Sequence, residues 1–234
     1  MSERVLWTAE ERTSGRAAFF DVDGTVTTRT TMFRFLEFLC ARRGRPEVYR
    51  EARQRLRDMT AAGLPRERTN RAYFTNLQDL VAGHVDQVAA EWFAAELAED
   101  GLFRPPVLDV IAEHRRAGDL VVLVSGSFPA CLLPVARHVG ADVVLCSMPE
   151  ISAGRYTGRV GQPMIGAEKA LAVQEFAALY GVSLAASAAY GDHLSDSDLL
   201  AAVGRPVVVG DDQALVSHAR EHGWELFEEK ERVR

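Results

Sequence analysis

Short apolar runs that stop abruptly at polar or glycine residues recur along the chain, once near its start and several times in its second half. A brief apolar run that ends in this way is typical of a buried strand followed by a loop. We therefore expect strands at residues 17–20, 120–124, 143–146, 188–190 and 206–209.

Segments with helical spacing separate these runs. We expect helices at residues 107–116, from Pro129 onward, and at 168–180, 199–203 and 213–222, and residues 155–160 resemble a small hairpin element. Strands that alternate with helices form parallel βαβ units. The pattern therefore predicts an α/β fold with a doubly wound parallel sheet.

Directly after the first strand, the pattern changes to helical periodicity. From Thr31 to about Asp100 the apolar residues recur at the spacing of amphipathic helices, and no segment there is a convincing strand. We expect a core domain formed by residues 17–28 and 105–234. Residues 29–104 would form an inserted all-helical cap domain, and residues 1–16 a polar N-terminal extension.

Polar residues follow three of the expected strands: Asp21 and Asp23, Ser125 and Gly126, and Asp192 and Asp196. In open α/β sheets, ligands bind outside the carboxyl ends of the strands. Parallel topology would bring the three groups to one edge of the sheet. The helical block would then lie over that edge as a lid.

This set of residues suits the hydrolysis of a phosphomonoester. The uncatalysed reaction is among the slowest known, and a carboxylate such as Asp21 can divide it into two steps through a covalent aspartyl-phosphate. Mg²⁺ usually takes one or two carboxylates alongside water and phosphate. Asp21 and Asp192, with a backbone carbonyl at Asp23, would be its protein ligands.

Other groups would serve the transfer itself. Asp23 lies two residues after Asp21, so in an extended segment both point to the same side. As general acid and then base, Asp23 would contribute about 10²–10⁴-fold, with its pKa raised by neighbouring carboxylates. We expect Ser125 and the Gly126 N–H to hold phosphoryl oxygens. Lys169 would offset their charge from the start of a helix, where the dipole also favours anions.

The same residues carry a resemblance to a known family. Residues 21–27, Asp-Val-Asp-Gly-Thr-Val-Thr, resemble the DxDGT[LV]T nucleophile motif of the haloacid dehalogenase-like (HAD) superfamily. Residues 124–126, Lys169 and residues 191–196 resemble its second, third and fourth motifs in matching order and spacing. The cap length, Ser-Gly-Ser-Phe at 125–128 and Gly-Trp at 223–224 are similar to the phosphoserine-phosphatase-like branch, subfamily IB. The resemblance covers most of the chain, from Ala17 onward.

The resemblance implies a Rossmann-like core, Mg²⁺ as cofactor and a set of roles. It implies nucleophilic attack by Asp21, general acid and base catalysis by Asp23, phosphate binding by Ser125 and Lys169, Mg²⁺ coordination by Asp192, and support of Mg²⁺ or orientation of Lys169 by Asp196. The carboxylate at position 23 favours hydrolysis of phosphate esters.

Two positions depart from the pattern of that branch. Phosphoserine phosphatases carry a Glu nine residues after the nucleophile, where it holds the substrate's ammonium group, and this chain has Thr30 there. This difference argues against phosphoserine as the substrate. His193 stands where many relatives have a small polar residue. It either touches the phosphate or leaving group or points to solvent.

Composition and charge disfavour some classes of binding partner. The 234-residue chain has 27 Lys and Arg against 33 Asp and Glu, so no basic excess favours nucleic acid or an anionic membrane. The longest apolar stretch, 120–136, is too short and too broken to span a bilayer. Three widely spaced cysteines predict neither a zinc site nor a disulfide framework, and a cytoplasmic location fits best.

Rival interpretations apply to the same residues. Singly, each motif is more often a turn, a loop or a solvated helix residue, but their joint order favours a site. A phosphotransferase or phosphomutase would use the same phosphoaspartate with a different acceptor. A phospho-receiver switch is disfavoured by the helical insert and by Asp23, and a catalytically silent binding protein by the intact set of residues.

The expected cap is less informative. We interpret the basic run at residues 42–57 as a solvated helix face, and Arg29, Arg66 and Arg68 are weak candidates for substrate contacts. Phe33, Phe35, Phe38 and Trp92 are expected in the cap core. A lid of this size should exclude bulky ligands, so a small phosphorylated metabolite is the expected substrate. Amino-alcohol, sugar and organic acid phosphates remain open, as does the oligomeric state.

Overall fold

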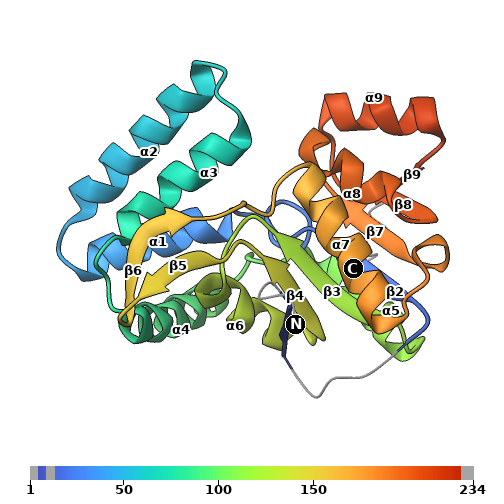
Figure 1. Cartoon of the computed structure of the whole chain (residues 1–234), viewed down its shortest axis with the longest axis horizontal. Coiled ribbons are helices and arrows are strands. Elements are labelled where there is room, and N and C mark those ends of the chain that lie inside the picture. The colour runs from blue at the N-terminus through green and yellow to red at the C-terminus, as the bar shows by residue number, and fades with distance from the viewer. Residues whose placement is uncertain (1–4, 9–13, 228–234) are drawn as a thin grey trace.

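The computed structural model describes residues 5–8 and 14–227, which form a layered core and a cap (Figure 1). Within these residues, the core sheet has the strand order β1-β4-β3-β2-β7-β8-β9. The strands are β1 (Val5–Trp7), β2 (Ala17–Phe20), β3 (Leu120–Ser125), β4 (Val143–Cys146), β7 (Ala188–Gly191), β8 (Arg205–Val208) and β9 (Glu225–Leu226). All neighbouring strands from β4 to β9 in this order pair in parallel, as predicted.

Helices cover both faces of the sheet. They are α5 (Pro105–Arg116), α6 (Pro129–Val139), α7 (Ala167–Tyr180), α8 (Ser197–Ala201) and α9 (Gln213–His222). Successive residues of a strand point to opposite faces. Accordingly, Ala18 and Phe20 join the apolar cluster that includes α5 and α6, whereas Ala17 and Phe19 join the cluster of α7, α8 and α9. The central strands are therefore buried on both sides.

Strand β1 lies in the segment expected to be a polar extension. It pairs antiparallel with β4, and the ring of Trp7 packs edge-on against Tyr180 at a centroid distance of 5.3 Å. Residues 5–7 are an apolar Val-Leu-Trp run within polar surroundings. Residues 1–4 and 9–13 of the expected extension lie outside the described residues.

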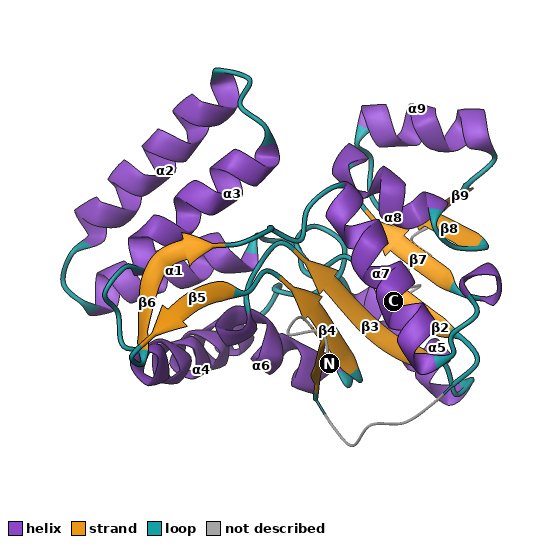
Figure 2. Cartoon of the chain, in the orientation of Figure 1, coloured by secondary structure: helices purple, strands orange, loops and turns teal. Residues whose placement is uncertain are grey.

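The cap contains helices α1 (Thr31–Arg42), α2 (Pro46–Ala61), α3 (Arg66–Phe74) and α4 (Ala82–Glu99). It also borders a hairpin from later in the chain, formed by β5 (Pro149–Ser152) and β6 (Arg155–Val160) (Figure 2). Backbone hydrogen bonds of 2.9 Å join Tyr156 of this hairpin to Asp79 and Leu80. The helical cap segment thus pairs with a hairpin that comes later in the sequence, after core strand β4.

One aromatic side chain joins the cap, the hairpin and the core. Phe128, at the start of α6, is fully buried. Its ring lies 5.8 Å from that of Phe35 in α1, 5.7 Å from Phe74 in α3 and 6.2 Å from Tyr156 in β6. Edge-to-face contacts of this kind add to the stabilisation from burial. The cap and the core therefore share one apolar cluster.

None of the helices within residues 5–8 and 14–227 combines the length and apolarity needed to cross a membrane. The three cysteines, Cys40, Cys131 and Cys146, are all buried free thiols.

Phe128→Ala tests this shared cluster. Removing a fully buried phenyl ring should lower the free energy of unfolding by about 3–5 kcal/mol, through lost burial and the cavity left behind. Leu179→Ala is the control, because Leu179 is 57% exposed and its loss should cost less than about 1 kcal/mol. Urea unfolding measures both, and a loss below about 1 kcal/mol for Phe128→Ala would contradict the shared cluster.

Candidate active site

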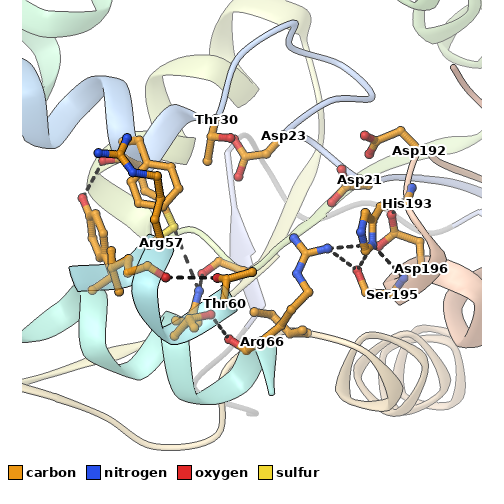
Figure 3. Close-up of a pocket in the computed structure, with 18 of the residues that line it drawn as sticks. Asp21, Asp23, Thr30, Arg57, Thr60, Arg66, Asp192, His193, Ser195 and Asp196 are labelled. Carbon is orange, nitrogen blue, oxygen red and sulfur yellow. Dashed lines mark hydrogen bonds between the residues drawn. The ribbon is translucent and has the colours of Figure 1, made fainter. Parts of the chain in front are cut away.

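A cavity of about 610 Å³ lies between the cap and the carboxyl ends of the core strands. Strand β2 lies between β3 and β7, so the chain order reverses there, and α/β folds bind ligands at such switch points. Figure 3 shows Asp21, Asp192 and His193 on the core side of the cavity and Arg57 and Thr60 on the cap side. The three polar strand ends therefore meet at one edge, with the cap over it.

Lys169 joins two of the predicted site carboxylates. Its Nζ donates hydrogen bonds to Asp21 Oδ1 at 2.5 Å and to Asp196 Oδ1 at 2.7 Å, and the lysine is only 5% exposed. Burial lowers the pKa of Lys169, but the charges of Asp196 and Asp21 raise it by more. The ammonium group therefore stays charged at physiological pH. Helix α7 brings it there from its first turn.

The carboxylates at this point exceed the available positive charge. Burial raises the pKa of Asp21, although Lys169 opposes the shift, and burial followed by the charges of Asp21 and Asp196 raises the pKa of Asp192 to about 8. Asp192 accepts a hydrogen bond of 3.1 Å from the Thr25 hydroxyl, which favours the ionised carboxylate but does not offset the rise in pKa. A further cation would favour the ionised form of these groups.

The same carboxylates have the arrangement and chemistry of a hard-cation site. Asp21, Asp192 and Asp196 offer oxygen atoms that all lie within 4.8 Å of one another. Magnesium and similar ions prefer oxygen ligands. The donor set therefore fits the predicted cofactor. The side chain of Asp23, whose backbone carbonyl was the predicted ligand, is not part of this carboxylate group.

Asp23 lies beside the nucleophile candidate and touches the cap. Its Oδ1 accepts a hydrogen bond of 2.7 Å from the backbone N–H of Thr31, and its Oδ2 accepts one of 3.3 Å from the Ser125 hydroxyl. Burial, followed by the charge of Asp21, raises the pKa of Asp23 to about 6. A carboxyl group with this pKa can donate and later accept a proton near neutral pH.

The glycines of the predicted motifs make room for these side chains. A Cβ atom at Gly24, which has φ of +116°, would lie 2.0 Å from Asp192 Oδ2. Gly126 lines the cavity, and its carbonyl accepts a hydrogen bond of 2.9 Å from Asn70 of α3. Ser125 is 1% exposed and reaches the site through its bond to Asp23.

His193 connects the core to the cap. Its Nδ1 accepts a hydrogen bond of 3.0 Å from the backbone N–H of Ser195 and lies 2.7 Å from Arg66 Nη1 (Figure 3). Because both groups are donors, Nδ1 must accept and therefore carries no proton. Burial, followed by the charge of Arg66, lowers the pKa of His193, which favours this neutral ring. His193 lines the cavity and is also exposed to solvent.

Several cavity residues were missed from sequence. Arg53 and Arg57 line the cavity, although Arg57 is also exposed to solvent, so this part of the run 42–57 is a cavity wall as well as a solvated face. Their spacing of four residues, which puts them on one face of a helix, was the available signal. Phe33 also lines the cavity, whereas Phe35 and Trp92 are buried as expected.

Comparisons with known proteins identify the family of this chain. A family model for haloacid dehalogenase-like hydrolases matches residues 18–201. The chain belongs to this family. The predicted HAD superfamily and the predicted fold are therefore confirmed.

Named relatives of this HAD hydrolase include two proteins of Mycobacterium tuberculosis. A probable phosphatase is 31% identical over 217 residues, which cover 90% of this chain and 74% of the relative. The phosphoserine phosphatase SerB1 is 31% identical over 216 residues, which cover 90% of this chain and 70% of the relative. The predicted likeness to the phosphoserine-phosphatase branch is thus confirmed.

A solved structure has a closely similar fold. The structure of a protein of unknown function from Bordetella pertussis matches with a TM-score of 0.81 and 28% identity, over 92% of this HAD hydrolase and 99% of that protein. The likeness extends over nearly the whole chain of both proteins.

Asp192→Asn tests the excess of negative charge. Because the folded-state pKa of Asp192 is raised from 3.8 to about 8, metal-free protein should lose stability as pH rises through this interval. In EDTA, the variant should match the parent near pH 4 and exceed it by about 1–3 kcal/mol at pH 9. Chemical denaturation across this pH range measures the difference.

Asp198→Asn is the matched control, because Asp198 is exposed on the neighbouring helix α8. It should change stability little at any pH. Added Mg²⁺ should stabilise the parent more than Asp192→Asn. A variant less stable than the parent at pH 9 in EDTA would contradict the charge argument.

Proposed function

We propose that this HAD hydrolase is a Mg²⁺-dependent phosphatase that hydrolyses a small phosphomonoester through phosphorylated Asp21. The observation that carries the proposal is the contact of the Asp21 carboxylate with buried Lys169, beside a second carboxyl group, Asp23, with a pKa of about 6. The relatives named as phosphatases support it.

In the first half-reaction, a carboxylate oxygen of Asp21 attacks phosphorus and the bond from phosphorus to the ester oxygen breaks. The leaving oxygen takes the proton of Asp23, so an alcohol departs. A pKa of about 6 keeps part of Asp23 protonated near neutral pH. The hydrogen bonds from Thr31 and Ser125 hold this carboxyl group in place.

In the second half-reaction, water attacks the phosphorus of the aspartyl-phosphate and the bond to Asp21 breaks. Asp23, now a carboxylate, accepts a proton from the attacking water. Inorganic phosphate leaves and the Asp21 carboxylate is restored. The same group thus serves as acid and then as base.

Positive charge and N–H donors hold the phosphoryl group. Lys169, Gly126 and Ser125 are the proposed phosphate-binding residues, and the first turn of α7 adds its dipole. Asp21 and Asp192, with the backbone carbonyl of Asp23, would hold Mg²⁺, which neutralises charge on the carboxylates and phosphoryl oxygens when bound. Of its two predicted roles, we assign Asp196 that of orienting Lys169, which it contacts at 2.7 Å.

The cavity limits the substrate. Its volume of about 610 Å³ suits a small molecule rather than a folded phosphoprotein. Thr30 lines this cavity with a neutral hydroxyl group, so it offers no charge to a substrate ammonium group. We therefore propose a phosphorylated metabolite other than phosphoserine.

Asp21→Asn and Asp23→Asn test the mechanism. With Mg²⁺ and a panel of phosphorylated metabolites, Asp21→Asn should abolish phosphate release because the amide is a poor nucleophile. Asp23→Asn should slow release by about 10²–10⁴-fold, because it removes the acid and base. Phosphate release is measured alongside acid-quenched, hydroxylamine-sensitive phosphoprotein, which only variants with Asp21 should form.

Asp198→Asn serves as the control and should retain parental turnover. Substantial turnover by Asp21→Asn would exclude the covalent route, and full activity in EDTA would exclude the metal. If substrate is consumed while phosphate passes to an added alcohol rather than to water, the enzyme is a phosphotransferase instead.

A further inference from the structure

The cap wall of the cavity carries two arginines from one helix. Arg53 and Arg57 are one turn apart on α2, and both line the cavity that also contains Asp21 and Lys169. Residues four apart on a helix are neighbours on its surface. Figure 3 shows Arg57 on the cap side, across the cavity from Asp21 and Asp192.

Neither arginine has a carboxylate partner among the described residues. Arg53 lies over the ring of Phe33, with its guanidinium carbon 3.9 Å from the centroid, and it contacts the hydroxyl of Tyr49. Arg57 donates a hydrogen bond of 2.8 Å to the neutral amide of Gln54. These contacts position the two guanidinium groups without offsetting their charge.

Two arginines of α1 that do not line the cavity have carboxylate partners. Arg34 forms an ion pair of 2.8 Å with Glu96, and Arg42 forms one of 2.7 Å with Glu91. These two arginines of α1 have acidic partners, whereas Arg55 of α2, outside the cavity, contacts only neutral groups in the part of the chain that the structure describes. At the cavity wall, the positive charges of Arg53 and Arg57 have no ion pair among the described residues and are accessible to a ligand that enters from solvent.

The distribution of charge around the cavity indicates the sign of that ligand. The carboxylates that line it, Asp21, Asp23, Asp192 and Asp196, all belong to the core side. Among the described lining residues, the cap contributes arginines and neutral side chains such as Thr30 and Thr60. A substrate ammonium group near α2 would thus meet repulsion and no counter-charge.

The phosphoryl group itself does not require these arginines, because Lys169 and the first turn of α7 already serve it on the core side. Arg66, the third cap arginine at the cavity, is engaged with His193 and Ser195. Arg53 and Arg57 therefore remain for the other end of the substrate.

We propose that Arg53 and Arg57 form a second anion-binding subsite, and that the substrate is a phosphomonoester with a second anionic group at its far end. Guanidinium groups pair with carboxylate and phosphate oxygens through two parallel N–H donors, so either anion suits them. This inference rests on the proposed function, since it names the substrate class of the same site.

A matched series of synthetic esters tests the subsite. Each ester has a phosphate at one end of a straight chain of three to six carbons, and the other end is a methyl, a carboxylate, a second phosphate or an ammonium group. For the parent, kcat/KM should be highest with an anionic end and lowest with the ammonium end. The preferred anion distinguishes a phosphorylated acid from a bisphosphate.

Arg53→Gln/Arg57→Gln should raise KM for the preferred anionic ester by about 10–100-fold and leave kcat/KM for the methyl ester within about threefold. Arg55→Gln is the matched control. It removes one positive charge from the same helix, but Arg55 contacts Thr75 and Asn76 away from this cavity. This control should retain the parental preference.

A binding measurement separates this inference from the proposed function. By calorimetry, the non-hydrolysable phosphonate with the preferred anionic end should bind the parent more tightly than the double variant. If it does so while no ester is hydrolysed, the subsite stands and the proposed function fails. If the methyl and anionic esters are hydrolysed equally by parent and double variant, the proposed function stands and the subsite is wrong.

Discussion

The ammonium group of Lys169 is the charge around which the candidate site is built. Burying an ion pair removes both partners from water, and their attraction often does no more than offset that cost. Here one buried ammonium faces Asp21 and Asp196, with Asp192 close by. Burial, followed by the charges of Asp21 and Asp196, raises the pKa of Asp192. Such an arrangement is poor for stability alone and is typical of a site that completes itself with a cation and an anionic substrate.

Side-chain hydrogen bonds join the cap to this charged centre. The backbone N–H of Thr31, at the start of α1, holds Asp23, and Arg66 of α3 reaches His193 on the core. Below these polar contacts, Phe128 places cap and core in one apolar cluster. The cap is therefore in direct polar and apolar contact with the edge of the core that carries the carboxylates.

Much of the fold was predictable because its signals are local. Helix α9 occupies the expected residues 213–222, since Asp212 caps its first turn and Gly223 ends it in the left-handed conformation. Asp21 and Asp23 follow the strand that the apolar run 17–20 predicts. Residues 155–160 were predicted to form a small hairpin, but they form only the second strand, β6, of a hairpin whose first strand is β5. The pairing of β6 with Asp79 and Leu80 was not predicted. That pairing depends on hydrogen bonds between segments far apart in sequence, for which neither segment carries a separate signal.

By itself, the sequence determined the family, the alternation of strands and helices, and the carboxylates and lysine that parallel topology must collect at one edge. Their order along the chain and the direction of the strands were sufficient, because the carboxyl ends of parallel strands share an edge. Only the tertiary structure decided which face of α2 borders the cavity. That helix is polar around most of its circumference, with Ala52 and Leu56 as its buried residues, so its sequence could not distinguish the wall of a cavity from a solvated surface. The packing of α2 against α1 and α3 made that choice, and with it placed Arg53 and Arg57 at the cavity.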